Sequence, residues 1–438
     1  MPTQTLHRPR KTRSLRWWVG TMLFASTTIN YVDRQTLSLL APYLKILYHW
    51  TNSDYVNIVI AFRVAYSIGQ TVCGRWVDRI GTRLGITLTV FFYSLVSVLT
   101  PLANGILGFM GFRVALGFAE SANWPAATKV VSEWFPARER ALATAFFDSG
   151  SSIGGALAPF LVLWIYFHWG WRLAFVVPGI LGFLWLFVWR RYYFHPEQHP
   201  SISAEEREML RQERRAHESV IQATRIRWRD LLRIPQTWGV IAARTFTDPV
   251  WYFVTDWFPI YLVAKGIDLR DGLIAVWVPF LSADLGNFAG GAASGYLVRR
   301  GWPLGWARKA VVIAGGCGTM LLIPTVFTQN LGLITILFAI STFSYACFST
   351  IANVLPSDLY HGSAVATVSG LSGTCSSIGT IFAMKAVGYL ADARVGSGGH
   401  AFDPIMVACG IIPLVGMLLV LILVRNTRAT HDGVVLPI

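Results

Sequence analysis

Apolar segments of membrane-spanning length alternate with short polar connections along the whole chain. A helix that crosses the hydrocarbon core of a bilayer needs about 20 predominantly apolar residues, and each segment supplies roughly that number. The pattern therefore predicts an all-α integral membrane protein with twelve transmembrane helices. The first six are expected at residues 17–43, 55–77, 84–101, 104–131, 139–162 and 172–193, and the last six at 237–264, 272–298, 309–328, 331–356, 362–390 and 404–424.

One long polar stretch separates the sixth apolar segment from the seventh. It divides the chain into an N-terminal six-helix half (1–193), a linker (194–236) and a C-terminal six-helix half (237–438). Within the linker, Ser203-Ala204-Glu205-Glu206 has the spacing of a capping box and is followed by a charged run. We therefore expect a short soluble helix inside the linker.

Composition and charge support a membrane protein. Hydrophobic residues make up 54% of the chain and charged residues 14%, whereas a soluble domain has about 25% charged residues. The net charge of +14 is concentrated in connections, with five Lys or Arg residues before the first segment and ten between Arg190 and Arg233. Because positively charged connections stay cytoplasmic, we expect both termini and the linker in the cytoplasm. The expected partner is therefore a lipid bilayer and not nucleic acid.

The five cysteines lie within apolar segments and form no Cys-x-x-Cys pair, which argues against disulfides and against a thiolate metal site. The chain also shows no metal-ligand spacing and no nucleophile–base pair, so we expect no enzyme activity, no catalytic residues, no metal and no cofactor. The basic N-terminus leads into a segment too long for the apolar core of a signal peptide. We interpret that segment as a retained first helix.

Charged residues occur in the interior of several apolar segments, beginning with Asn30-Tyr31-Val32-Asp33-Arg34 in the first. A charge at the centre of a bilayer costs roughly 2.5–3.5 kcal/mol on insertion scales, so such residues usually face a bundle interior or a water-filled cavity. The pattern therefore predicts a protein that moves something polar across a membrane. The other charged residues of this kind are Arg63, Arg113, Glu120, Asp148, Arg244, Asp248 and Asp284.

The connection after the second segment reads Gly74-x-x-x-Asp78-Arg79-x-Gly81-x-Arg83. Together with twelve segments and a central linker, this motif resembles the major facilitator superfamily. Further stretches resemble its anion:cation symporter family of sugar-acid transporters, with hexuronate and aldonate transporters as the nearest members. These stretches are Asn30 to Arg34, Arg113-x6-Glu120 followed by Pro125, Ser132 to Arg140, and Gly150 to Gly154.

The resemblance implies a bacterial inner-membrane protein whose halves rock about a central cavity. It also implies that Asp78 and Arg79 belong to a gate network that holds the inner side closed. The chain departs from the family pattern at two positions. Ser151, at a position implied to touch sugar hydroxyls, replaces the Gln of the galactonate type, and Arg299 stands where an acid is usual.

Arg34 is the residue that we expect to hold a substrate carboxylate. A guanidinium group keeps its charge and offers a two-pronged fork that matches a carboxylate, and the resemblance implies the same role. The alternative is a structural ion pair with Asp33 or Glu120. Adjacent helix residues point about 100° apart, so Asp33 and Arg34 should have different partners.

Arg113 and Glu120 are seven residues apart on one helix face, about 10 Å apart along the axis, so each needs a partner from elsewhere. Asp33 is the expected partner of Arg113. A carboxyl group in an apolar cavity retains its proton, and an approaching arginine favours release. We therefore predict that Asp33, Arg113 and Glu120 couple proton movement to transport. A static charge network is the alternative.

The remaining candidates form polar stripes on other predicted helices. Arg244 and Asp248 can pair along the seventh segment, and Pro249 should interrupt the helix beside a cavity. The predicted substrate-binding set is Tyr31, Arg34, Tyr66, Ser151, Trp251 and Ser372, and the secondary candidates are Arg63, Asp148, Arg244, Asp248, Asp284 and Asn353.

The sequence thus predicts a proton-coupled symporter for a small organic anion, most simply a sugar acid such as a hexuronate or an aldonate. Two alternatives stay open. One is a transporter or uniporter of another organic anion, such as a dicarboxylate, an aromatic acid or an organic phosphate. The other is a sensor with transporter architecture that no longer transports.

Overall fold

The computed structural model describes residues 15–218, 228–266, 273–360, 364–394, 400 and 402–424, which form helices joined by short connections. The first half contains α1 (Leu15–Tyr48), α2 (Asn52–Ile80), α3 (Thr82–Leu99), the 3-10 helix η1 (Thr100–Leu102), α4 (Gly105–Glu120), α5 (Asn123–Trp134), α6 (Ala137–Trp169) and α7 (Trp171–Tyr192). The linker contains α8 (Ala204–Glu218) and α9 (Trp228–Leu231). The second half contains α10 (Pro235–Thr245), α11 (Asp248–Ala264), α12 (Leu273–Arg299), α13 (Leu304–Thr319), the 3-10 helix η2 (Met320–Phe327), α14 (Leu331–Leu359), α15 (Val365–Asp392) and α16 (Asp403–Leu423).

The prediction of twelve spans in two six-helix halves is confirmed when α4 with α5, and α10 with α11, are each taken as one interrupted span. Nine helical stretches of the described chain are long and apolar enough on their own to cross a membrane. The interruption leaves α10 and α11 individually short, and α1 carries Asp33 and Arg34 in its interior. The predicted linker helix is present as α8.

Two of the spans are interrupted beside prolines. Pro249 lies in the first turn of α11, directly after the break at Phe246 and Thr247, as the sequence predicts. The break between α4 and α5 differs from the continuous span expected at 104–131. Its physical cause is Pro125, which lacks an N–H and whose ring would clash with the carbonyl oxygen of Ser121 in a continuous helix.

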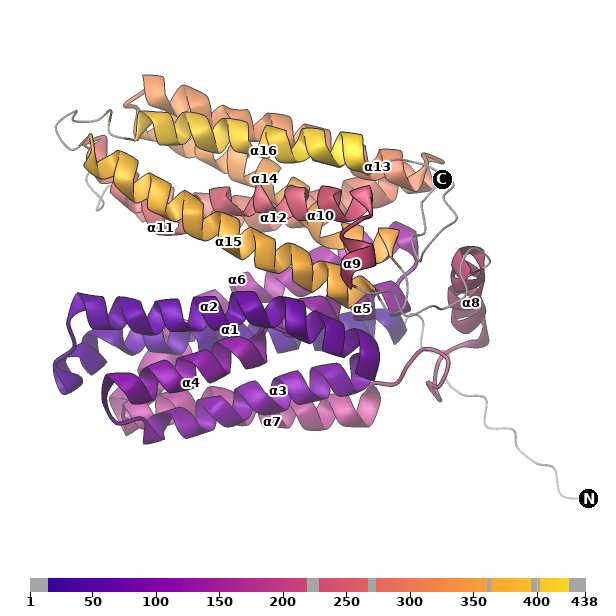
Figure 1. Ribbon diagram of the computed structural model, residues 1–438, viewed down its shortest axis with the longest axis horizontal. Coiled ribbons are helices and arrows are strands. Elements are labelled where there is room, and N and C mark those ends of the chain that lie inside the picture. Colours follow the sequence, from indigo (N-terminus) through magenta and orange to yellow (C-terminus); the bar gives the residue numbers. More distant parts are fainter. Residues whose placement is uncertain are drawn as a thin grey trace, which may run out of the picture.

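The two halves lie as two layers, with α1–α7 in one layer and α10–α16 in the other (Figure 1). We call the end of the bundle beside α8 the linker end and the opposite end the far end. Across the interface, α2 packs on α15, α6 packs on α12, and α5 contacts both α14 and α15. A Cβ atom on Gly74 of α2 would overlap the carbonyl oxygen of Ala366, and one on Gly370 of α15 would overlap that of Gln70. These glycines let the two helix backbones touch near the linker end.

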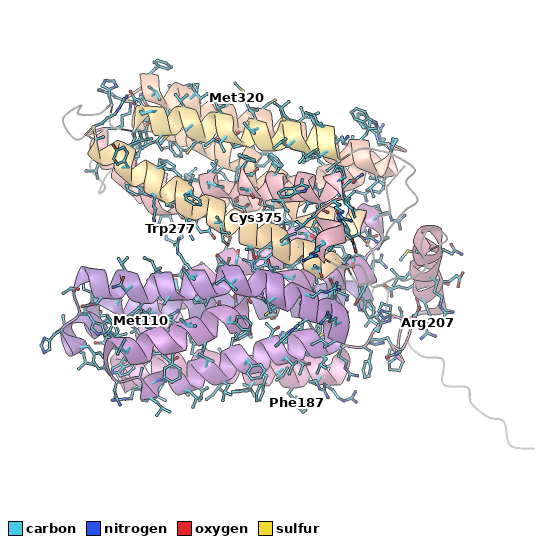
Figure 2. All side chains as sticks on the ribbon, viewed as in Figure 1. Met110, Phe187, Arg207, Trp277, Met320 and Cys375 are labelled. Carbon is cyan, nitrogen blue, oxygen red and sulfur yellow. The ribbon has the colours of Figure 1, made fainter. Side chains whose placement is uncertain are left out.

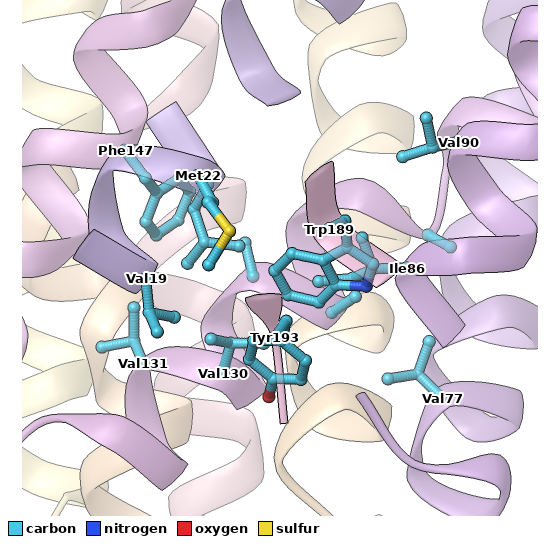
Figure 3. Close-up of a cluster of buried hydrophobic side chains, with 14 of the residues drawn as sticks. Val19, Met22, Val77, Ile86, Val90, Val130, Val131, Phe147, Trp189 and Tyr193 are labelled. Carbon is cyan, nitrogen blue, oxygen red and sulfur yellow. The ribbon is translucent and has the colours of Figure 1, made fainter. Parts of the chain in front are cut away.

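The core of the first half packs aromatic side chains, among them Trp189 and Tyr193, against valine, isoleucine and methionine side chains (Figure 3). Trp189 and Tyr193 stack with ring centroids 3.8 Å apart, and both side chains are fully buried. The Tyr193 hydroxyl group bonds that of Thr82 at 2.8 Å, which ties the end of α7 to the start of α3. α8 packs against this cluster through Leu210.

α8 is clamped to the first half by ion pairs. The Arg16 guanidinium donates to Glu139 of α6 at 2.7 Å and to Glu206 of α8 at 2.9 Å. Ile202 and Leu210 join the aromatic core of the first half. The docked segment includes His199, which lies buried against the Trp134 ring at 5.7 Å between centroids.

Large apolar side chains cover the outside of the bundle (Figure 2). Phe187 is 74% exposed and Trp277 is 68% exposed, both within long helices. In water such a surface would be unfavourable, whereas in hydrocarbon it is the expected exterior of a membrane protein.

Candidate functional site

A central cavity lies between the two halves. It encloses about 830 Å³ of empty space, open solvent included. Helices α1, α2, α5 and α6 of the first half line it, together with α10, α11, α12, α14 and α15 of the second. The lining residues are Tyr31, Arg34, Tyr66, Gln70, Trp124, Asp148, Ser151, Ser152, Arg244, Asp248, Trp251, Tyr252, Ala283, Asp284, Asn287, Tyr345, Ala346, Ser349, Asn353, Ser376 and Ser377.

Arg34 is the cation that α1 presents to this cavity. Its Nε and Nη2 atoms donate to Oε2 of Glu120 at 3.0 and 2.8 Å. Its guanidinium carbon lies 4.8 Å from the ring centroids of both Tyr31 and Tyr66. Because Tyr31 precedes Arg34 by one helical turn, both side chains reach the cavity from the same face of α1. The guanidinium is thus held between two aromatic rings and one buried carboxylate.

Asp33 points away from Arg34 and has a different partner, as predicted. It is almost fully buried and accepts a short hydrogen bond from the Ser97 hydroxyl of α3. The expected ion pair between Asp33 and Arg113 is wrong for this conformation. Arg113 is 5% exposed, and its Nη2 atom has no hydrogen-bond partner among the described residues. In this conformation the Asp33 carboxylate accepts from Ser97, a tertiary contact that helix spacing could not reveal.

A second cavity continues from the central one, and we call it the far-end cavity. It shares Tyr31, Arg34 and Tyr66 with the central cavity and extends to Val59 of α2 and Ile381 of α15. Since α2 runs toward the linker end and α15 runs away from it, both of these residues lie toward the far end. Its lining residues are Tyr31, Arg34, Gln35, Leu37, Ser38, Val59, Phe62, Arg63, Tyr66, Ser67, Arg113, Trp251, Tyr252, Thr255, Ser377, Thr380 and Ile381.

The wall of the central cavity contributed by the second half contains an internal ion pair. Arg244 and Asp248 lie 3.3 Å apart across the break between α10 and α11. Asp248 also accepts a short hydrogen bond from Ser376. On α12, Asp284 accepts from the Ser152 hydroxyl of α6 at 2.6 Å, which links the two halves.

Most predicted site residues reach a cavity. Tyr31, Arg34, Tyr66, Ser151 and Trp251 line the central one, as do Asp148, Arg244, Asp248, Asp284 and Asn353. Arg63 and Arg113 line the far-end cavity. These placements do not test the roles, which stay predictions. Asp33 and Glu120 are buried behind Arg34.

The placement of Ser372 differs from the prediction that it lines the substrate site. It is fully buried, lines neither cavity and donates to the carbonyl oxygen of Ser369 on its own helix. Ser376 and Ser377, one turn further along α15, face the central cavity instead. The hydroxyl-rich run from 369 to 377 covers all sides of the helix, so its sequence could not fix which hydroxyl groups face inward.

Several lining residues were not in the predicted sets. Tyr345 and Ser349 of α14 stand eight and four residues before Asn353, so a polar stripe at helical spacing was present in the sequence. Tyr252 follows Trp251 directly. Trp124 beside the break before Pro125 carries no such signal, because an aromatic residue in an apolar segment is indistinguishable from core.

The linker end is closed by charged side chains that cross between the halves. Asp78 of α2 accepts from the backbone N–H groups of Ala366 and Thr367, at 3.2 and 2.7 Å, at the start of α15. Lys129 of α5 pairs with the same carboxylate at 3.1 Å. Arg79, predicted to share this gate, is exposed. In this conformation Lys129 supplies the cation that the sequence assigned to Arg79.

A second closure at the same end is built on Asp358 of α14. Its carboxylate accepts from Arg308 of α13 at 2.8 Å and pairs with Arg140 of α6 at 3.3 Å. Arg140 donates further to the Ser357 carbonyl oxygen at 2.9 Å, and Arg308 donates to that of Ala137 at 2.8 Å. All three charged side chains are buried, so this network excludes water from the linker end.

The five cysteines are free, and within the described ranges no group of three or more His, Cys, Asp or Glu side chains is placed to hold a metal ion.

Comparison with known proteins identifies relatives of similar length. A sequence model described as the Major Facilitator Superfamily matches residues 23–384. A hexuronate transporter of Escherichia coli strain K12 is 32% identical over 425 residues, which are 96% of this chain and 96% of that protein. A probable galactarate/D-glucarate transporter of the same strain is 29% identical over 449 residues, covering 98% of this chain and 99% of that protein.

The fold is also shared with solved structures. The structure of XylE, a proton:xylose symporter, bound to 6-bromo-6-deoxy-D-glucose superposes with a TM-score of 0.69. The two chains are 14% identical, and the superposition covers 92% of this chain and 94% of that one. At that identity the likeness shows the architecture alone.

Proposed function

This chain belongs to the major facilitator superfamily, and from this premise we propose that it carries a sugar acid, a hexuronate or an aldonate, across a membrane together with protons. The relatives support the substrate class, because one is named a hexuronate transporter and another a probable galactarate/D-glucarate transporter. The family supports a transport role and not an enzymatic one.

The observation that carries the proposal is the setting of Arg34. A substrate carboxylate can replace Glu120 on the same guanidinium fork, because both ligands are carboxylates and both suit two parallel N–H donors. The flanking rings of Tyr31 and Tyr66 keep the guanidinium in the cavity while the partners exchange. The remaining walls offer hydroxyl and amide groups, including Ser151, that suit sugar hydroxyls.

Protonation of Glu120 supplies the coupling in this proposal. While ionised, the buried Glu120 carboxylate holds Arg34 through two hydrogen bonds to one oxygen. Once protonated it loses most of that attraction, and Arg34 becomes available to the substrate. Binding of the anion and binding of the proton then favour each other, which is the thermodynamic condition for symport.

Asp33 and Arg113 complete the proposed coupling group. Asp33 is buried beside Ser97, and the Arg113 guanidinium carbon lies 6.0 Å from the Phe62 ring, with Nη2 lacking a hydrogen-bond partner among the described residues. A rotation of either side chain would bring opposite charges together. We assign Asp33 as the second proton carrier and Arg113 as the group that favours proton release.

The conformation fits one step of alternating access. The linker end is closed by Asp78 and Asp358, while the far-end cavity leads into the central one. In our proposal the linker end is cytoplasmic, because the linker and the N-terminal segment carry most of the basic residues. The protein then stands open to the outside of a bacterial inner membrane, with both termini in the cytoplasm, and residues 1–193 and 237–438 rock about the cavity.

Uptake into proteoliposomes tests the proposal. Labelled D-galacturonate and D-galactonate would be supplied with and without an inward proton gradient. We expect gradient-driven accumulation of one of these acids and its loss in Arg34→Ala. Arg172→Ala is the matched control, because Arg172 is an exposed arginine at the far end that stacks on Trp171.

Each contrary outcome has a distinct meaning. Equilibration that ignores the proton gradient would make the protein a uniporter and remove the coupling role of Asp33 and Glu120. Uptake of other organic anions but of no sugar acid would refute the substrate class. Uptake that survives Arg34→Ala would refute the binding site.

A further inference from the structure

Among the described residues, every charged side chain that lines the far-end cavity is an arginine. Arg34, Arg63 and Arg113 all line it, and its described lining includes no carboxylate. Arg113 is 5% exposed, and its Nη2 atom has no hydrogen-bond partner in the described chain, so this donor is available to an anion. An approaching sugar acid therefore meets a surface that attracts its carboxylate.

Away from Arg34, the lining of the central cavity contains more carboxylates than cations. Three carboxylates line it, at Asp148, Asp248 and Asp284. Asp248 is neutralised by Arg244 at 3.3 Å. Asp284 accepts from the uncharged Ser152 hydroxyl at 2.6 Å, and neither Asp284 nor Asp148 forms an ion pair within the described residues. Two carboxylates of this cavity thus lack a direct ion-pair partner among the described residues.

The register between α1 and α6 places these charges at different depths. The helices run parallel: Arg16 bonds Glu139 near the linker end, and fifteen residues further along each helix a Cβ atom on Gly154 would meet the Cβ of Tyr31 at 2.9 Å. Each residue of α1 is therefore level with the residue of α6 that is numbered 123 higher.

By this register Arg34 is level with residue 157 of α6, and Asp148 lies nine residues nearer the linker end. At 1.5 Å per residue the backbone levels of Arg34 and Asp148 differ by about 14 Å. Asp284 is close to the level of Ser152, one turn above Asp148. The cavity thus has a cationic end toward the far end and an anionic floor toward the linker end.

We propose that Asp148 and Asp284 determine specificity by excluding sugar acids with a second carboxylate. The inference rests on the proposed function, in which Arg34 holds the carboxylate. The rest of the substrate then extends to the floor, where carboxylates accept hydrogen bonds from hydroxyl groups. A hexuronate or an aldonate presents uncharged groups there. An aldarate presents a second carboxylate, and like charges brought together in a desolvated site oppose binding.

D-Galacturonate and galactarate form a related pair for the test, because they share one carbon skeleton and differ at C1, an aldehyde carbon that closes into a ring hemiacetal in one and a carboxylate in the other. Each unlabelled acid would compete with labelled D-galacturonate for uptake by the full-length protein in proteoliposomes. We expect galactarate to inhibit on the order of 100-fold more weakly, since like-charge contact costs several kcal/mol and each 1.4 kcal/mol is tenfold.

The variants Asp148→Asn and Asp284→Asn remove one charge each and keep the side-chain shape. Together they should narrow the ratio of the two inhibition constants by about tenfold or more. Ser349→Ala, which changes the lining of the same cavity without changing charge, should leave the ratio as it is. Stabilisation of each purified variant by D-galacturonate in a thermal-shift measurement shows that it is folded.

The outcomes separate this inference from the proposed function. If the wild-type protein accepts galactarate as well as galacturonate, the inference is overturned and sugar-acid transport stands. The same holds if the double variant binds galacturonate but keeps the wild-type ratio. If the wild-type protein binds neither acid, the proposed function fails and the inference fails with it. If the double variant does not fold, the ratio of inhibition constants of the wild-type protein still tests whether galactarate is excluded.

Discussion

Asp78 connects the two halves at the closed linker end, so removing its charge should shift the balance between the end states. Its side chain is 1% exposed. In Asp78→Asn the side chain keeps its size, and Lys129 stays within the same half. Only the contacts to α15 distinguish the closed state from the open one, because those contacts cross between the halves.

The magnitude follows from these contacts. Asp78 accepts from the N–H groups of Ala366 at 3.2 Å and Thr367 at 2.7 Å, and from the Thr367 hydroxyl at 2.5 Å. A hydrogen bond to a charged group contributes about 1.5–3 kcal/mol and a neutral one about 0.5–1.5 kcal/mol. A carboxylate at a helix N-terminus adds about 0.3–1 kcal/mol more. Neutralisation should therefore remove about 2 kcal/mol, roughly a 30-fold shift toward the linker-open state.

Distances between spin labels would measure this shift. Labels at Arg79 and Arg300, which are both exposed and lie in opposite halves near the linker end, would be placed in a cysteine-free background. Asp78→Asn should enlarge the population with a long distance. Asp54→Asn is the control, because Asp54 also caps a helix but forms its hydrogen bonds with Thr51, three residues away in the same half. An unchanged distance distribution in Asp78→Asn would refute the reasoning.

Three further predictions concern other parts of the molecule. Gly370→Val should also populate the linker-open state, because its side chain would overlap the Gln70 carbonyl oxygen in the closed state at a cost of about 1–3 kcal/mol; the same labels report it. Glu120→Gln should still exchange sugar acid across the membrane when both sides hold equal concentrations. Its gradient-driven accumulation ratio should fall at least about tenfold, because residue 120 no longer binds and releases a proton. His199 should make the docking of α8 sensitive to pH. Burial lowers the pKa of His199, whose neutral ring bonds the Tyr192 carbonyl oxygen at 3.2 Å and accepts from the Ser201 N–H at 3.1 Å. The stabilisation is complete above the ordinary pKa of about 6.5 and is lost as pH falls through the lower folded value. Hydrogen exchange of 204–218, corrected for intrinsic rates, should become faster as the pH falls from 7.5 to 5.5. An equal increase in a His199→Gln variant would contradict this prediction.

The spans and the cavity charges were predictable because the bilayer imposes both. Hydrocarbon demands continuous apolar helices, and it makes an interior charge such as Arg34 costly unless it faces the cavity. Pro249 was a sound signal for a broken helix because Arg244 and Asp248 already marked that turn as polar. Glu120, Ser121 and Asn123 mark the turn before Pro125 as polar in the same way, so the same reasoning applied there would have predicted the break between α4 and α5.

Pairing between helices was not predictable from one sequence. The choice of Ser97 over Arg113 as the partner of Asp33 depends on how α3 and α4 rotate against α1, and periodicity does not fix that rotation. The same limit explains Ser372, whose helix is rotated so that its hydroxyl group faces its own backbone. Lys129 and Asp358 at the gate likewise gain their roles only from contacts between halves.

The clamp on α8 assigns the two helices of the linker to different halves of the molecule. Glu206 fixes α8 to the first half, while Leu231 of α9 is buried in the core of the second. In the proposed transport cycle α8 therefore moves with the first half, and α9 moves with the second. The separation between α8 and α9 then changes with the state of the protein, although both helices belong to one linker. A covalent cross-link between these two helices would restrain the transport cycle.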